Sequence, residues 1–241
     1  MINEDETLDD LLIGGLYIIQ KRNAFRFGTD AVLLSDFASR IKSRKTLDLC
    51  TGNGIIPLLL SAKSDTPEIF GIEIQPPIAD MAKRSVKYNS LEDRVTITEG
   101  DLRKPRYGRG EFDLVTCNPP YIKNGGGIKS ENSSKLIARH EVECTLRDAV
   151  SAAAAALKPL GHFVMVHRAE RLADILCTLR EFKLEPKILR LVYPDAQKPP
   201  NLVLVDAQKD SGENLKLLPP LFLFNSDGER SEELKRIYSE D

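Results

Sequence analysis

The sequence predicts an α/β protein whose sheet is mainly parallel and is covered by helices on both faces. Short apolar runs with strand character alternate along the chain with longer segments in which apolar residues recur every three or four positions, as on one face of a helix. Two apolar runs in succession near the C-terminus indicate an antiparallel hairpin at the end of that sheet.

The first half of the chain alternates between the two kinds of element. We predict strands at 15–20, 24–28, 45–50, 68–74, 94–100 and 112–117, and helices at 30–41, 54–63 and 76–90. Residues 1–43 therefore form a strand and helix extension that we expect to pack on the core. Residues 44–241 form the main domain, and the whole is expected to be a single globular unit.

The second half continues the alternation after a polar, glycine-rich stretch at 122–134. We predict an alanine-rich helix at 147–161 that ends at Gly161, a strand at 162–167, a helix at 169–182, a hairpin of 187–194 and 200–209, and a charged C-terminal helix. The main domain then holds a seven-stranded, mainly parallel sheet with a C-terminal antiparallel hairpin.

Composition is that of an ordinary globular protein, with 41% hydrophobic and 29% charged residues in 241. There is no apolar run of about 18 residues, and the N-terminus is acidic where a signal peptide is basic, so we expect a cytoplasmic protein. The four cysteines (Cys50, Cys117, Cys144, Cys177) are scattered without a CxxC pair. This favours reduced thiols, and no metal site is expected.

The net charge of −2 does not exclude a nucleic-acid partner, because the acidity is concentrated near the chain ends. The first ten residues hold five acids and no base. The body of the chain is therefore positively charged, as a protein that binds an anionic polymer requires.

Polar residues stand at the ends of four predicted strands. The turn "LDLCTGNG" (47–54) places Gly52 and Gly54 where a tight turn lets a ligand approach the backbone and a helix N-terminus. Glu73 ends the next strand and could accept hydrogen bonds from a ribose diol, and Asp101 follows the third. Taken singly, Glu73 also suits a helix N-terminus and Asp101 a turn.

The carboxyl ends of parallel strands meet at one edge of a sheet, so these residues and the "NPPY" after the fourth strand are expected to form one row. That row resembles the class I S-adenosylmethionine-dependent methyltransferases, which have a Rossmann-like fold. The resemblance implies the following sites: Asp48, Gly52, Asn53 and Gly54 around the methionine end of the cofactor, Glu73 and Ile74 at its ribose, and Asp101 and Leu102 at its adenine. Cys50 stands where that family usually has glycine, which puts the backbone torsion there in question.

The segment "NPPY" comprises Asn118, Pro119, Pro120 and Tyr121. An exocyclic or amide nitrogen is a poor nucleophile because its lone pair is delocalised. If the Asn118 side-chain oxygen and the Pro119 carbonyl each accept one N–H, the nitrogen is drawn toward a tetrahedral geometry, and the acceptors stabilise the charge that develops on it. Pro120 stiffens the turn, and Tyr121 offers a ring on which a base can stack.

Longer stretches carry a closer resemblance. "NAFRFGTDAVLLSDFA", "LDLCTGNGIIPLLLS", "NPPYIK", "ARHE" and "VYPDAQKPPNLVLV" are similar to the bacterial tRNA-valine (adenine-N6) methyltransferases, which modify adenosine 37. The resemblance implies a tRNA partner and places Arg26 and Thr29 near the methionine end of the cofactor. Thr29 is also expected to be a helix N-cap.

The basic residues Lys123, Lys129, Lys135 and Arg139 follow "NPPY" and could bind RNA phosphates, although such charges more often form a solvated surface. A second hypothesis is N5-methylation of a glutamine in a protein such as a release factor, because "NPPY" is shared with those enzymes. A third is a non-catalytic RNA-binding module of the same fold, motivated by Cys50.

Overall fold

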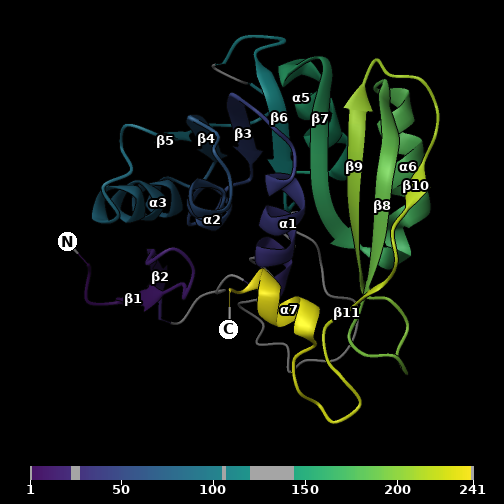
Figure 1. Cartoon of the computed structure of the whole chain (residues 1–241). Helices are drawn as coiled ribbons and strands as arrows, with labels where there is room; N and C mark the ends of the chain where they lie inside the picture. The colour runs from purple at the N-terminus through teal and green to yellow at the C-terminus, as the bar shows by residue number, and fades with distance from the viewer. Residues whose placement is uncertain (1, 23–27, 105–106, 120–143, 240–241) are drawn as a thin grey trace, which may run out of the picture.

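A nine-stranded sheet is the centre of the computed structural model, which describes residues 2–22, 28–104, 107–119 and 144–239 (Figure 1). Its strands lie in the order β10-β8-β9-β7-β6-β3-β4-β5, with β11 also paired to β8. The strands are β3 Lys45–Leu49, β4 Glu68–Glu73, β5 Val95–Glu99, β6 Phe112–Cys117, β7 Leu157–Arg168, β8 Leu184–Tyr193, β9 Leu202–Lys209, β10 Lys216–Leu217 and β11 Leu221–Phe222.

Only β9 runs against its neighbours among these strands, since it is antiparallel to both β7 and β8 while every other described pair in the sheet is parallel. The predicted seven strands and the C-terminal hairpin are therefore confirmed as β3 to β9. The two extra strands, β10 and β11, have two residues each and lie too close to prolines and polar residues to be recognised from periodicity.

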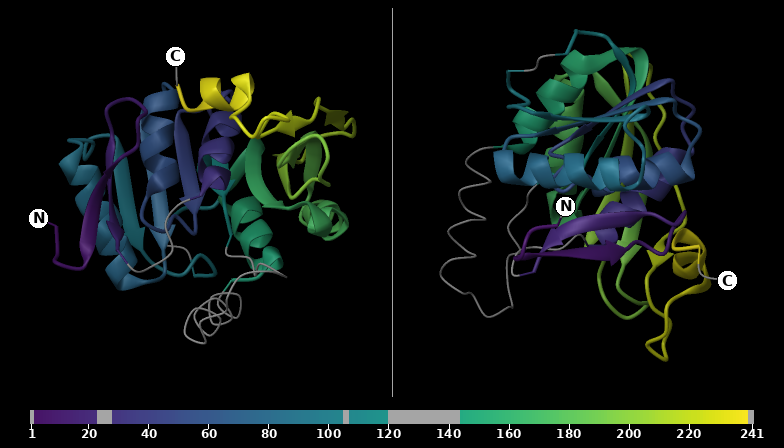
Figure 2. Two further views of the ribbon diagram at one scale, coloured as in Figure 1. Left: turned by 90° about the horizontal axis from the view of Figure 1, so that it is seen from below. Right: turned by 90° about the vertical axis from the view of Figure 1, so that its left-hand side faces the viewer.

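Helices cover both faces of the sheet (Figures 1 and 2). Residues of α1 Thr29–Ser39, α2 Ile55–Lys63, α3 Pro76–Tyr88 and α7 Glu232–Ile237 share one hydrophobic core, and those of α5 Leu146–Ala156 and α6 Leu172–Glu181 share a second. A single turn of 3₁₀ helix, Ala169–Arg171, precedes α6. Along β7, Val164 and Val166 belong to the first core and Phe163 and Met165 to the second, as the period of two requires.

The predicted helix 147–161 is too long. Helix α5 ends at Ala156, and Leu157 already begins β7 with φ −72° and ψ 140°. Pro159 explains the difference, because its ring would clash with the carbonyl four residues earlier in a continued helix. The residue before a proline also favours an extended backbone, which suits Lys158 at the start of a strand.

The N-terminal extension contains a hairpin of its own. Strand β1, Glu6–Asp10, pairs antiparallel with β2, Tyr17–Lys21. The predicted strand at 15–20 is confirmed as β2, but its partner is the acidic segment 6–10 that we had not expected to be a strand. The predicted strand at 24–28 lies outside the described residues except for Gly28.

Hydrogen bonds fasten this hairpin to α3. The buried Glu6 carboxylate accepts from Arg84 Nη1 and Nη2, both at 2.7 Å. Ile19 N donates to Ser85 Oγ at 2.9 Å, and Tyr17 N donates to Asn89 Oδ1 at 2.8 Å. The Arg84 guanidinium lowers the pKa of Glu6 to about 2, so one of the N-terminal acids is a structural charge rather than part of an acidic tail.

We expect Glu6→Gln to lower the free energy of unfolding by about 3 kcal/mol at pH 7, because it breaks a buried ion pair. The folded-state pKa lies below the value of 4.5 for a free carboxyl, so the stabilisation is present above pH 4.5 and is lost as the pH falls toward 2. Urea denaturation of the two proteins between pH 3 and pH 7 measures the difference.

Asp80→Asn is the matched control, because Asp80 pairs with the same arginine but is 62% exposed in its side chain. It should cost less than about 1 kcal/mol. A loss for Glu6→Gln that stays constant with pH would contradict this account.

Candidate active site

The turn after β3 has the backbone that the sequence predicts for a ligand-binding loop. Gly52 and Gly54 have φ of 56° and 85°, values that favour glycine. Gly54 is the N-cap of α2, and a Cβ atom there would lie 3.2 Å from Cβ of Ala82 on α3. The turn therefore fits closely against α3 and presents the N-terminus of α2 at the carboxyl edge of the sheet.

Cys50 adopts the left-handed conformation that its glycine-like position requires, with φ 56°. A non-glycine residue holds this conformation at a cost of about 1 kcal/mol or more. Its Sγ atom lies 3.6 Å from Sγ of Cys144, and contact with Cys117 raises the pKa of the Cys50 thiol. The departure from glycine thus leaves the shape of the turn intact.

Glu73 supports the turn from the neighbouring strand. Its Oε2 accepts from Gly52 N at 3.0 Å, and its Oε1 accepts from the main-chain and side-chain nitrogens of Gln75 at 3.0 and 3.1 Å. Glu73 is 5% exposed, and Ile74 beside it is 37% exposed. These bonds hold Glu73 at the carboxyl end of β4, next to the turn.

Asp101 and Leu102 follow β5 at the same edge. Asp101 accepts from Arg103 Nε at 2.9 Å and from Nη2 at 2.8 Å, and this pairing lowers the pKa of Asp101. Leu102 is buried. Arg103, one of the basic residues after β5, is therefore paired with a carboxylate in this structure.

Asp48 is the most perturbed carboxyl of the site. It is fully buried on β3, and its Oδ1 accepts from Thr116 Oγ1 on β6 at 2.7 Å. Burial raises the pKa of Asp48 to about 7, and the charge of Glu73 adds to the rise. Asp48 Oδ2 and Thr51 Oγ1 are buried without a well-formed hydrogen bond in the described part of the chain, although Thr51 lies close enough to Asp48 to oppose the rise of its pKa.

Asn118 follows β6 at the same edge of the sheet. Strand β6 pairs with β3 so that Cys117 lies opposite Leu49, which sets Asn118 beside the start of the turn. Its Oδ1 is buried and has no hydrogen-bond partner among the described residues. Pro119 is buried as well, whereas Pro120 and Tyr121 lie outside the described residues.

Thr29 is the first residue of α1 and not its N-cap, so that prediction is wrong. The N-cap is Gly28, whose backbone is extended with φ −104° and ψ 175°. Thr29 already has a helical backbone, and its Oγ1 accepts from the hydroxyl of Tyr238 at 3.4 Å. Five other predicted site residues lie outside the described residues: Arg26, Lys123, Lys129, Lys135 and Arg139.

Gln20 is a site residue that the sequence analysis missed. It is the last residue but one of β2, is 2% exposed, and accepts from Asn53 Nδ2 at 3.2 Å through its Oε1. The only hint in the sequence is a polar residue at the end of an apolar run, and such residues are common at strand ends. A hydrogen bond from the N-terminal hairpin therefore fixes the side chain of Asn53.

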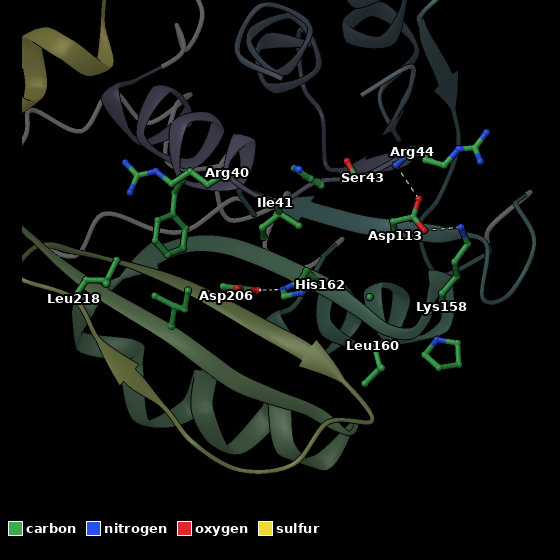
Figure 3. Close-up of a pocket in the computed structure, with 15 residues that line it drawn as sticks. Arg40, Ile41, Ser43, Arg44, Asp113, Lys158, Leu160, His162, Asp206 and Leu218 are labelled. Atoms are coloured by element: carbon green, nitrogen blue, oxygen red, sulfur yellow. Dashed lines mark hydrogen bonds and ion pairs between the residues drawn. The ribbon is translucent and has the colours of Figure 1, made fainter. Parts of the chain in front are cut away.

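A cavity of about 840 Å³ opens at the opposite edge of the sheet (Figure 3). It is lined by residues at the C-terminal end of α1 and at the amino ends of the parallel strands, among them Arg44, Asp113 and Lys158. Its carboxylates are paired: Asp113 accepts from Arg44 N and Lys158 Nζ, and Asp206 pairs with His162 at 2.8 Å. The predicted row of site residues lies at the other edge.

No helix in the described segments is long and apolar enough to cross a membrane. Within those same segments, no group of three or more His, Cys, Asp or Glu side chains is arranged to hold a metal ion.

The fold and the site together define a class I, Rossmann-like methyltransferase. The chain belongs to the methyltransferase small domain family, whose model matches residues 22–181. Relatives named tRNA1(Val) (adenine(37)-N6)-methyltransferase include one from Aeromonas salmonicida, 29% identical over 78% of this chain and 79% of its own length. Another, from a Flavobacteriaceae bacterium, is 25% identical over 92% of this chain and 89% of its own.

Solved structures share the fold. A predicted O-methyltransferase from Agrobacterium tumefaciens superposes with a TM-score of 0.71 at 18% identity, covering 88% of this chain and 96% of that one. The Thermus thermophilus 16S rRNA N2 G1207 methyltransferase, in complex with AdoMet and guanosine, superposes with a TM-score of 0.58 at 19% identity, covering 85% of this chain and 50% of that one.

We expect Asp48→Asn to stabilise the ligand-free protein at neutral pH. The pKa of Asp48 is raised from 3.8 to about 7 on folding, so its contribution to stability is lost as the pH rises from about 4 to 7. The uncharged amide avoids this loss, and the gain should grow with pH to at most about 4 kcal/mol and level off above pH 7. Denaturation at several pH values measures it.

Asp113→Asn is a control of opposite sign. Burial alone would raise the pKa of Asp113, but hydrogen bonds from Lys158, Lys45 N and Arg44 N lower it. This variant should lose stability above pH 4, so a gain in both variants would show that the effect at Asp48 has another cause.

Proposed function

We propose that the protein transfers a methyl group from S-adenosylmethionine to N6 of an adenosine in tRNA. The observation that carries this proposal is the buried and unpaired Oδ1 of Asn118 at the carboxyl end of β6. Family membership and the names of the relatives point the same way. By analogy with those relatives, the specific target is adenosine 37 of a valine tRNA.

The residues at the carboxyl edge fit the methyl donor. Asp48 Oδ2 and Thr51 Oγ1 are buried polar atoms without a well-formed hydrogen bond among the described residues, and a polar ligand could complete them. The turn at Gly52 and Gly54 offers close backbone approach, with Asn53 and Asp48 for the methionine end. Glu73 and Ile74 suit the ribose, and Asp101 and Leu102 suit the adenine. Arg26 and Thr29 complete the proposed site.

When bound, S-adenosylmethionine supplies an electrophilic methyl group on a sulfonium. Asn118 Oδ1 accepts one N–H of the target amine, and the Pro119 carbonyl accepts the other. Both hydrogen bonds become stronger as the nitrogen becomes positive. A hydrogen bond to a charged group contributes about 1.5 to 3 kcal/mol. They therefore favour the transition state over the bound amine. No protein base is needed, because the methylated ammonium loses its extra proton to water.

The environment of Asn118 makes this acceptor effective. Oδ1 is excluded from solvent, so no water competes for it before the substrate arrives. The preceding residue, Cys117, is buried and paired with β3, which fixes the backbone that carries the amide. Pro120 is proposed to keep the turn rigid and Tyr121 to stack on the base, while Lys123, Lys129, Lys135 and Arg139 hold RNA phosphates.

The proposed function implies a cellular location and makes tRNA the partner. With a tRNA substrate, as the names of the relatives suggest, the protein would act in the cytoplasm, and the two acceptors need no metal for this chemistry. Glutamine N5-methylation of a release factor would use the same acceptors, and the names of the relatives favour tRNA. The intact turn at Cys50 removes the reason for proposing a non-catalytic RNA-binding module.

We expect Asn118→Ala to reduce methyl transfer by about two to three orders of magnitude, since it removes one acceptor that acts in the transition state. Binding of S-adenosylhomocysteine, measured by calorimetry, should change by less than about threefold, because Asn118 is assigned to the amine. Gln208→Ala is the control and should remain active, because Gln208 lies on β9 at the amino edge of the sheet, where its Nε2 donates to Leu160 O at 2.9 Å. Near-normal transfer by Asn118→Ala would refute the mechanism.

The substrate is tested by nucleoside mass spectrometry of tRNA from cells with and without the protein. We expect one N6-methyladenosine, in a valine tRNA, to disappear in the deletion strain and to return with the wild-type gene but not with Asn118→Ala. Incubation of purified release factor with enzyme and cofactor tests the alternative. A methylated glutamine with unchanged tRNA would replace our assignment.

A further inference from the structure

Three side chains connect the N-terminal hairpin to the turn after β3. Asn53 Nδ2 donates to Gln20 Oε1 at 3.2 Å, and Gln20 Nε2 donates to Asp9 Oδ2 at 2.5 Å. We call Asp9, Gln20 and Asn53 the amide chain. Gln20, its central member, is 2% exposed, and the bonds from the hairpin to α3 fix the strand on which it stands. The amide chain is therefore a rigid link.

The direction of its hydrogen bonds follows from the chemistry of Asp9. An ionised carboxylate only accepts, so Gln20 must turn its NH₂ group toward Asp9. The side-chain oxygen of Gln20 then faces Asn53, so Asn53 must donate to it through its own NH₂ group. This leaves Asn53 Oδ1 on the other side of the amide plane, where no described residue donates to it. A carboxylate in the hairpin thus sets which end of Asn53 faces outward from the link.

We propose that Asp9 and Gln20 are positioning residues that hold Asn53 Oδ1 as an acceptor for the α-ammonium group of the methyl donor. This inference rests on the proposed function, which places the methionine end of the donor at Asn53. An outward oxygen attracts an ammonium group, whereas a reversed amide would present N–H groups and repel it. The N-terminal hairpin then takes part in cofactor selection, although its residues need not touch the cofactor.

The first test uses two ligands that differ in the group in question. S-adenosylhomocysteine carries the α-ammonium group, and 5′-methylthioadenosine lacks the whole amino-acid part. Asp9→Asn can donate as well as accept, so it no longer fixes the direction of the amide chain. Calorimetry should show S-adenosylhomocysteine binding about tenfold more weakly, as for the loss of one charge-assisted hydrogen bond, with binding of 5′-methylthioadenosine unchanged.

The second test moves the carboxylate by one position. In the double variant Asp9→Asn with Gln20→Glu, the amide at position 9 donates to the carboxylate at position 20, which still accepts from Asn53 Nδ2. The direction of the chain is restored, so S-adenosylhomocysteine affinity should recover to within about threefold of wild type. A merely structural role gives no reason for a second substitution to repair the first.

Asp10→Asn is the matched control. Asp10 is the neighbouring carboxylate on β1, is exposed, and accepts from Leu12 N at 2.8 Å with no link to Asn53. The inference is overturned if Asp9→Asn behaves as Asp10→Asn toward both ligands, or if the double variant binds no better than Asp9→Asn. If the wild-type protein binds neither ligand, the proposed function fails and this inference fails with it.

Discussion

The parallel pairing of β3 with β6 is the constraint on which the site depends. It sets Asp48 opposite Thr116 and Leu49 opposite Cys117, so the strands end together and their next residues, Cys50 and Asn118, emerge side by side. The hydrogen bond from Thr116 to Asp48 locks this register inside the sheet. A shift by one residue would turn every side chain to the other face and separate the turn from Asn118.

The paired ends of β3 and β6 hold several groups in states that are unfavourable in a protein core. Asp48 is buried with a pKa raised to about 7, Cys50 has a left-handed backbone, and the Asn118 side-chain oxygen is buried without a partner. Each of these lowers the stability of the free protein. Their concentration within a few residues of two strand ends is what an active site requires, since a ligand can satisfy groups that the fold leaves incomplete.

The sequence was sufficient for the framework and for the row of site residues, because both follow from local rules. Strand and helix periods differ, and parallel strands bring their carboxyl ends to one edge, so Asp48, Glu73 and Asp101 could be grouped without coordinates. The predicted helix at 147–161 was too long because the run of alanines is a stronger helix signal than the single Pro159, three residues after Ala156, is a stop signal. Strand β1 was missed because Glu6 is acidic, and its burial depends on a partner far along the chain, Arg84.

Gln20 could not have been found in this way, since its role depends on a contact with Asn53 across 33 positions of the chain. The same is true of the support that Glu73 gives to Gly52. Local patterns show which residue types stand at a strand end, but not which of their atoms are already engaged by a neighbour. To assign a ligand contact one must know which atoms are still free to bind, and only the tertiary structure shows this.

The two edges of the sheet show why open space is a poor guide to the site. The amino edge has the cavity, but its carboxylates Asp113 and Asp206 are satisfied by Lys158, by main-chain N–H groups and by His162. The carboxyl edge holds Asp48 and Asn118, each with a buried oxygen that has no described partner. A polar ligand gains most where it supplies missing hydrogen bonds, because no protein partner has to be displaced. The buried acceptors at the ends of β3 and β6 are therefore the reason for proposing the chemistry at this edge, which is also the edge that the sequence predicts.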